Sequence, residues 1–206
     1  MVVTQVSSVT NSRSKVYIDD EFAFVLYKGE LRNYKITEGK IITPEIVEDI
    51  LKNVITKRAK LRGMALLKSR SYTKKQMQEK LKQGLYPDGV ICIALEYLES
   101  FGYIDDAQYA RDYIEYHSNN KSSKRIELDL AKKGIDKQEI SEAFKSCEKS
   151  GYKIDETWQI QEWIRKKSYD TNTTDIKEKQ KMMAFLFRKG FDVSSIHRVL
   201  NCDEFF

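Results

Sequence analysis

The sequence predicts a mainly α-helical fold: an elongated array of three three-helix repeats, preceded by a small β-strand N-terminal extension. An apolar pattern that occurs three times carries this prediction, with Leu81, Leu130 and Leu186 as its reference positions. Each leucine has an apolar residue four positions before it and an isoleucine ten positions after it. These residues are Met77, Ile126 and Met182, followed by Ile91, Ile140 and Ile196. Steps of about 50 residues indicate stacked copies of one supersecondary unit.

Composition supports an extended helical array. The chain of 206 residues is 33% charged and 41% hydrophobic, against about 25% and about 45–50% in an average globular protein. A high charged content is typical of a fold with more surface per residue than a sphere. The chain has only two prolines, Pro44 and Pro87, so long helices are permitted almost everywhere else.

No segment indicates secretion or membrane insertion. Residues 1–15 are polar and lack the apolar core of a signal peptide. No run approaches the roughly 20 apolar residues of a membrane span. We therefore expect a soluble protein in the cytoplasm.

The first 43 residues divide into a tail and a small sheet. Residues 1–14 are small and polar without periodicity, so we expect a flexible tail. Residues 15–43 alternate aromatic and β-branched positions as far as Ile36, with a turn signal at Asp19-Asp20. This pattern predicts a β meander of two or three strands. Such a meander is too small to be stable unless it packs on the next helix.

Thr43-Pro44 predicts the start of a long helix. Thr is a favoured N-cap, and Pro is favoured at the first helical position. Apolar residues then recur at helical spacing to about Ser69, a length of roughly 39 Å at 1.5 Å per residue. Gly63 inside this helix costs about 1 kcal/mol relative to Ala, which indicates a bend or a close helix contact there.

Each repeat should contain three helices. Capping boxes, in which a cap residue is followed three positions later by Gln or Glu, mark helix starts at Thr73, Asp105 and Asp136. The helices are expected over residues 50–69, 73–83 and 88–100, then 106–118, 122–133 and 137–149, then 156–167, 175–189 and 193–201. The repeats themselves span residues 44–100, 101–150 and 151–206.

The sequence contains no recognisable catalytic, cofactor or metal-binding motif. It lacks the glycine-rich phosphate loops and the nucleophile elbow of common enzyme families. The adjacent acids Asp105-Asp106 precede a helical apolar run, so a helix N-cap explains them better than a catalytic pair. The two histidines, His117 and His197, lack metal-ligand spacing. We therefore expect no enzyme activity, no cofactor and no bound metal.

Basic residues are the strongest candidates for partner binding. Residues 57–82 hold ten Lys and Arg residues against a single acid, Glu79, whereas the last two repeats are close to neutral. A solvated helix face explains this block about as well as a surface for a polyanion or an acidic protein groove.

Two basic pairs are expected where the helix dipole disfavours them. Lys74-Lys75 and Lys124-Arg125 should each lie in the first turn of a middle helix, near its positive end. This placement favours a function in binding phosphate or carboxylate groups. Basic residues in a last turn are favourable without any partner, so pairs there are weaker candidates. The candidate partner-binding residues are Arg62, Lys68, Arg70, Lys74, Lys75, Lys124, Arg125, Lys132, Lys133, Arg188 and Lys189.

Several segments carry a family resemblance. They read ALLKSRSYTKKQM at residues 65–77, LEYLESFGYIDD at 95–106, KRIEL at 124–128, and FL with RKGF between 185 and 191. Together, over about residues 58–201, they resemble the RecX family, bacterial regulators of the RecA recombinase. Each segment alone would be a weak match, but the set in this order is specific.

The resemblance implies a protein of three three-helix repeats with no catalytic residues. Its partner would be RecA, alone and as a filament on DNA, with weak direct contact to DNA and none to membranes. Family members usually suppress RecA's ATP hydrolysis and strand exchange, although some favour recombination. The resemblance therefore implies a monomeric regulator of homologous recombination, DNA repair and the SOS response.

A stand-alone DNA-binding protein is the alternative, because repeated helical hairpins resemble helix-turn-helix units. This alternative predicts tight and steeply salt-dependent DNA affinity in the absence of RecA. Weak DNA binding alongside strong filament binding would favour the regulator of RecA.

Overall fold

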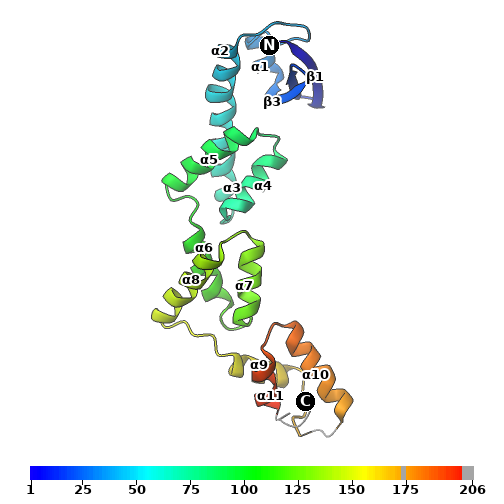
Figure 1. Ribbon diagram of the computed structural model, residues 1–206, viewed down its shortest axis with the longest axis vertical. Coiled ribbons are helices and arrows are strands. Elements are labelled where there is room, and N and C mark those ends of the chain that lie inside the picture. The colour runs from blue at the N-terminus through cyan, green and yellow to red at the C-terminus, as the bar shows by residue number, and fades with distance from the viewer. Residues whose placement is uncertain (173–174, 201–206) are drawn as a thin grey trace. The chain divides into compact units, whose positions relative to one another are not determined.

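The computed structural model describes residues 1–172 and 175–200. Its contacts divide the chain into two compact units, Met1–Asp105 (unit 1) and Asp106–Phe206 (unit 2). A small sheet opens unit 1, and helices make up most of the remaining chain (Figure 1). The predicted mainly α-helical class with N-terminal strands is therefore confirmed. In the part of the chain described, no helix combines the length and apolar character that a membrane crossing needs.

Three antiparallel strands open unit 1, in the order β1 (Val3–Thr10), β2 (Arg13–Ile18) and β3 (Glu21–Tyr27). The prediction of a flexible tail at 1–14 is wrong, because β1 pairs with β2 along most of its length. Val3 is fully buried, but most other side chains of β1 are exposed. The strand therefore depends on backbone pairing with β2, which its polar sequence does not reveal.

A two-residue turn joins β2 to β3. Asp19 and Asp20 both have positive φ, 48° and 69°, as a type I′ hairpin turn requires, so the predicted turn is confirmed. The strand pattern was predicted to continue to Ile36. This part of the prediction is wrong, because β3 ends at Tyr27 and Lys28–Asn33 form the helix α1. The Glu30 carboxylate accepts a backbone N–H at the start of α1 (2.7 Å), which satisfies one donor that the helix leaves unpaired.

The long helix begins where predicted but is not uniformly α-helical. Its successive segments are α2 (Pro44–Asp49), the π-helix η1 (Ile50–Thr56) and α3 (Lys57–Leu67). The apolar spacing did not distinguish the π turns from α turns, because seven residues are too few to establish either period. A Cβ on Gly63 would lie 2.6 Å from Leu98 Cδ1, so this glycine marks a close helix contact.

The remaining helices agree with the predicted ranges to within one residue at each end. Unit 1 continues with α4 (Lys74–Gln83) and α5 (Asp88–Ser100), which pack with α3. Unit 2 contains α6 (Asp106–His117), α7 (Ser123–Lys132), α8 (Lys137–Lys149), α9 (Glu156–Lys166), α10 (Ile176–Arg188) and α11 (Val193–Leu200). The last helix was expected to end at residue 201, which lies outside the described residues.

The repeated apolar positions form the cores of the three-helix groups. The core of unit 1 is continuous from the sheet to α5, whereas the described residues of unit 2 form two separate clusters, one in α6–α8 and one in α9–α11. The side chains of the threefold pattern are all buried: Met77, Leu81, Ile91, Ile126, Leu130, Ile140, Met182, Leu186 and Ile196. Burial of one stripe per helix is what an amphipathic pattern predicts.

The capping boxes predicted at Thr73 and Asp136 are confirmed. Thr73 and Gln76 exchange side-chain and backbone hydrogen bonds at the start of α4, and Asp136 and Glu139 do the same for α8. At the third position α6 begins directly after Asp105. These local signals explain why the helix starts were predictable.

Candidate partner-binding surfaces

Unit 1 presents five of the predicted residues on α3, α4 and the loop between them. All five are exposed, and they are Arg62, Lys68, Arg70, Lys74 and Lys75. Lys74 Nζ lies 3.0 Å from the Glu99 carboxylate, and the Arg70 guanidinium lies 4.4 Å from the centre of the Tyr72 ring. Such exposed contacts contribute little energy, so this surface can exchange them for an anionic partner.

Carboxylates offset the helix dipole for one member of each first-turn pair. Lys74 pairs with Glu99 of α5. In α7, Arg125 Nε lies 3.2 Å from Asp129 Oδ1. The other members, Lys75 and Lys124, are exposed, and neither forms an ion pair within the described residues. No nearby carboxylate among the described residues therefore offsets the repulsion between these two lysines and the positive ends of their helices.

Two last-turn lysines, Lys133 and Lys189, pack on aromatic rings of their own repeats. Lys133 Nζ lies 5.5 Å and 5.3 Å from the ring centres of Tyr109 and Tyr113, and Lys189 Nζ lies 4.3 Å from that of Trp163. Both lysines are half-buried, while the basic residue directly before each of them is exposed. The ring contacts give the two lysines a structural role.

Lys121 is a candidate that the sequence pattern did not single out, because it lies in a loop and at no repeated position. Its Nζ donates to Asp129 Oδ2 (2.9 Å) and to the Tyr113 hydroxyl (2.7 Å). Burial disfavours the charged ammonium, but these hydrogen bonds outweigh burial and hold the pKa of Lys121 above its usual value. Burial alone would raise the pKa of Asp129, but the contact with Lys121 holds it below its usual value.

The α6–α8 group and the α9–α11 group meet within unit 2 around the loop that precedes α7. The Ser122 hydroxyl caps α7 and also donates to the backbone oxygen of Lys189 (3.4 Å). From α9, the buried Gln159 donates its Nε2 hydrogens to the backbone oxygens of Ser118 and Lys121. These contacts fix the loop against α9 and the end of α10.

This meeting point encloses a basic recess, here called the junction hollow. It has a volume of about 430 Å³ and is lined by His117, Asn120, Lys121, Arg125, Arg188 and Lys189. The structure thus brings together three of the predicted residues, Arg125, Arg188 and Lys189, although the first lies in the second repeat and the other two lie in the third. Lys124 and Lys132 belong to unit 2 but do not line the hollow.

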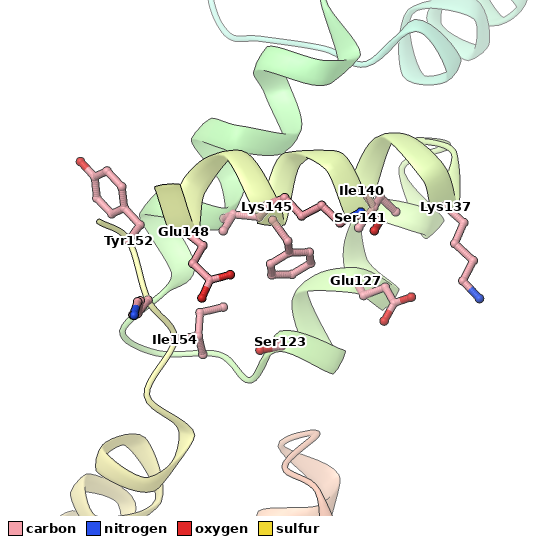
Figure 2. A pocket seen from close by; sticks show the side chains of 12 residues that line it. Ser123, Glu127, Lys137, Ile140, Ser141, Lys145, Glu148, Tyr152 and Ile154 are labelled. Carbon is pink, nitrogen blue, oxygen red and sulfur yellow. The ribbon is translucent and has the colours of Figure 1, made fainter. Parts of the chain in front are cut away.

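A second recess in unit 2 has a different character. It measures about 500 Å³ and lies between α7, α8 and the segment that follows α8. Figure 2 shows Glu127 on α7 and Ile140 on α8 at one end, with Glu148 and Ile154 towards the other. Two carboxylates and three lysines share its lining with apolar side chains. This near balance gives no preference for an anion, so the junction hollow is the stronger candidate site.

Comparisons with known proteins give a consistent result. The family model described as the second three-helix domain of RecX matches residues 105–143, and that of the third three-helix domain matches residues 158–200. A "Regulatory protein RecX" of Clostridioides difficile is 28% identical over 195 residues, which cover 93% of this chain and 89% of that protein. Its namesake in Caldanaerobacter subterraneus is 28% identical over 203 residues, covering 98% and 99%.

Solved structures agree in fold. A crystal structure of a regulatory protein RecX superposes with a TM-score of 0.63 at 21% sequence identity, covering 98% of this chain and 99% of that one. At that identity the likeness shows the fold alone. Two domain matches, relatives that align along nearly the whole chain and the shared fold lead to one conclusion: this chain matches two RecX three-helix domains and is similar along nearly its whole length to regulatory proteins RecX.

Proposed function

We propose that this protein is a non-enzymatic regulator that binds the RecA recombinase, alone and as a filament on DNA. Binding inhibits RecA's ATP hydrolysis, strand exchange and filament growth. Similarity to regulatory proteins along nearly the whole chain supports a regulatory role. The observation that carries the proposal is the presence of exposed Lys and Arg side chains on both units.

A filament on DNA suits a protein of this kind. It presents phosphates and acidic side chains at repeated positions, and each unit of this chain carries basic residues that can contact them. Contacts that are weak one by one become strong when the units that make them are linked. Within this proposal the protein acts in the cytoplasm as a monomer.

The direct test adds the protein to RecA assembled on single-stranded DNA. ATP turnover should fall, and the protein should sediment with the filaments. An unchanged rate of ATP turnover at a several-fold molar excess, together with no co-sedimentation, would contradict the proposal.

Charge-reversal variants test the basic surfaces. Lys75→Glu combined with Lys124→Glu reverses one exposed first-turn lysine in each unit, and should abolish both inhibition and co-sedimentation. Lys52→Glu combined with Lys149→Glu is the matched control, because it also reverses one exposed helical lysine per unit. Circular dichroism should be unchanged for both. If the two double variants inhibit equally, the first-turn lysines do not contact the filament.

A further inference from the structure

The junction hollow concentrates positive charge. Four cations line it, Lys121, Arg125, Arg188 and Lys189, and among the described residues its lining contains no Asp or Glu. One carboxylate lies behind it, that of Asp129, and it pairs with both Lys121 and Arg125. The local charge therefore stays strongly positive, and a recess walled by protein strengthens its attraction for an anion relative to a flat surface.

The hollow is assembled from two repeats. Lys121 and Arg125 come from the α6–α7 loop and the first turn of α7, whereas Arg188 and Lys189 come from the end of α10. Neither repeat alone carries more than two of these cations there. The side chains of Gln159 and Ser122 donate hydrogen bonds to backbone oxygens of the other repeat, and these bonds hold the two sides together.

Several cations are oriented before any ligand arrives. Asp129 holds Lys121 and Arg125 through ion pairs with N–O distances of 2.9 Å and 3.2 Å, and the Trp163 ring contacts the ammonium of Lys189. Side chains that are already fixed lose less conformational entropy on binding. Arg188 is exposed, and its guanidinium can form two parallel hydrogen bonds to one phosphate.

We propose that the junction hollow binds a backbone phosphate of single-stranded DNA, and that it does so without RecA. The proposal rests on the proposed function only for the choice of nucleic acid. A phosphodiester carries one full negative charge, shared by two non-bridging oxygens that can each accept more than one hydrogen bond, and this matches cations that converge from separate elements. A flexible single strand can place one of its phosphates inside a recess of about 430 Å³. A carboxylate on a folded protein could enter the recess only if it protruded from that protein's surface.

The test measures binding of the full chain to a fluorescent oligothymidine by anisotropy, without RecA and at several salt concentrations. Arg188→Gln should weaken binding about five- to tenfold and reduce the magnitude of the log–log salt slope by about 0.7, as expected for one lost single-strand phosphate contact. Lys149→Gln removes the same charge from an exposed position outside the hollow, and should change affinity by less than twofold.

Equal affinity of the two variants for the oligonucleotide would overturn the proposal. If Arg188→Gln instead weakens binding to RecA in the absence of DNA while oligonucleotide affinity is kept, the hollow binds protein carboxylates; this outcome overturns the phosphate site but leaves the proposed function intact. Conversely, Arg188-dependent DNA binding by a protein that leaves RecA unaffected supports the phosphate site and contradicts the proposed function. Unchanged melting temperatures show that both variants are folded.

Discussion

The side-chain amide of Gln159 in α9 donates a hydrogen bond of 3.1 Å to the backbone oxygen of Lys121, which lies 38 residues earlier in the chain. The same nitrogen also donates to the backbone oxygen of Ser118. Since Gln159 is buried, water cannot replace these bonds when the side chain is changed. One glutamine therefore holds the loop that presents Lys121 to the junction hollow.

Gln159→Glu should destabilise unit 2 strongly. The substitution keeps the shape of the side chain but removes both donors and places a carboxylate against two carbonyl oxygens. We expect a loss of at least about 2 kcal/mol, which corresponds to a fall in melting temperature of about 10 °C for a unit of this size. Gln161→Glu, on the exposed side of the same helix, should have little effect. Similar thermal unfolding of the two variants would show that the buried amide is not essential.

Gly190→Ala should be more destabilising than Gly151→Ala. Both glycines have φ near +90°, so alanine costs roughly 1–2 kcal/mol at either position. A Cβ at Gly190 would also lie 2.7 Å from the Ser122 hydroxyl, whereas one at Gly151 meets no atom within 4 Å. Urea unfolding should therefore show an extra loss of about 1 kcal/mol or more for Gly190→Ala. Equal losses of stability for the two variants would mean that the residues around Gly190 can move to accommodate the added methyl group.

Two helical glycines of unit 1 should respond to alanine with opposite signs. Gly89 in α5 has no atom within 4 Å of its Cβ position, so Gly89→Ala should raise stability by up to about 1 kcal/mol. Gly63→Ala would collide with Leu98, which is fully buried and has little room to move. It should lower stability by about 1–3 kcal/mol. Chemical denaturation of the two variants tests the close contact between Gly63 and Leu98. A gain in stability for both variants would refute that contact.

The stability of unit 2 should depend on pH through His117. Burial lowers the pKa of His117 below 6.5, and the positive charge of Lys121 acts in the same direction, while a hydrogen bond with Asn120 opposes them. As the pH falls below about 6.5, the unfolded chain takes up the proton first, so stability is lost until the folded imidazole also becomes charged. Urea unfolding at about pH 7.5 and about pH 5.5, on either side of the ordinary histidine pKa, should show a larger loss for the native chain than for His117→Gln. The same loss of stability in the native chain and in His117→Gln would exclude His117 as the source of the pH dependence.

Local signals explain which parts of the fold were predictable. The threefold apolar register marked the buried positions, and the capping residues Thr73 and Asp136 marked helix starts, because both act within a few neighbouring residues. The strand β1 was missed because its partner, β2, and not its own side chains, gives it order. The candidate basic residues were likewise found by charge and helix position, but Lys121 has no such local mark.

The helices, their caps and the apolar stripes of the three cores could be predicted from the sequence, since they depend on contacts spaced three or four residues apart. Which basic residues share a site could not be predicted in this way, because it depends on how the repeats pack. Arg125 and Arg188 line one hollow because Gln159 and Ser122 form hydrogen bonds to distant backbone oxygens. Hydrogen bonds between residues so far apart in the chain leave no periodic trace in the sequence.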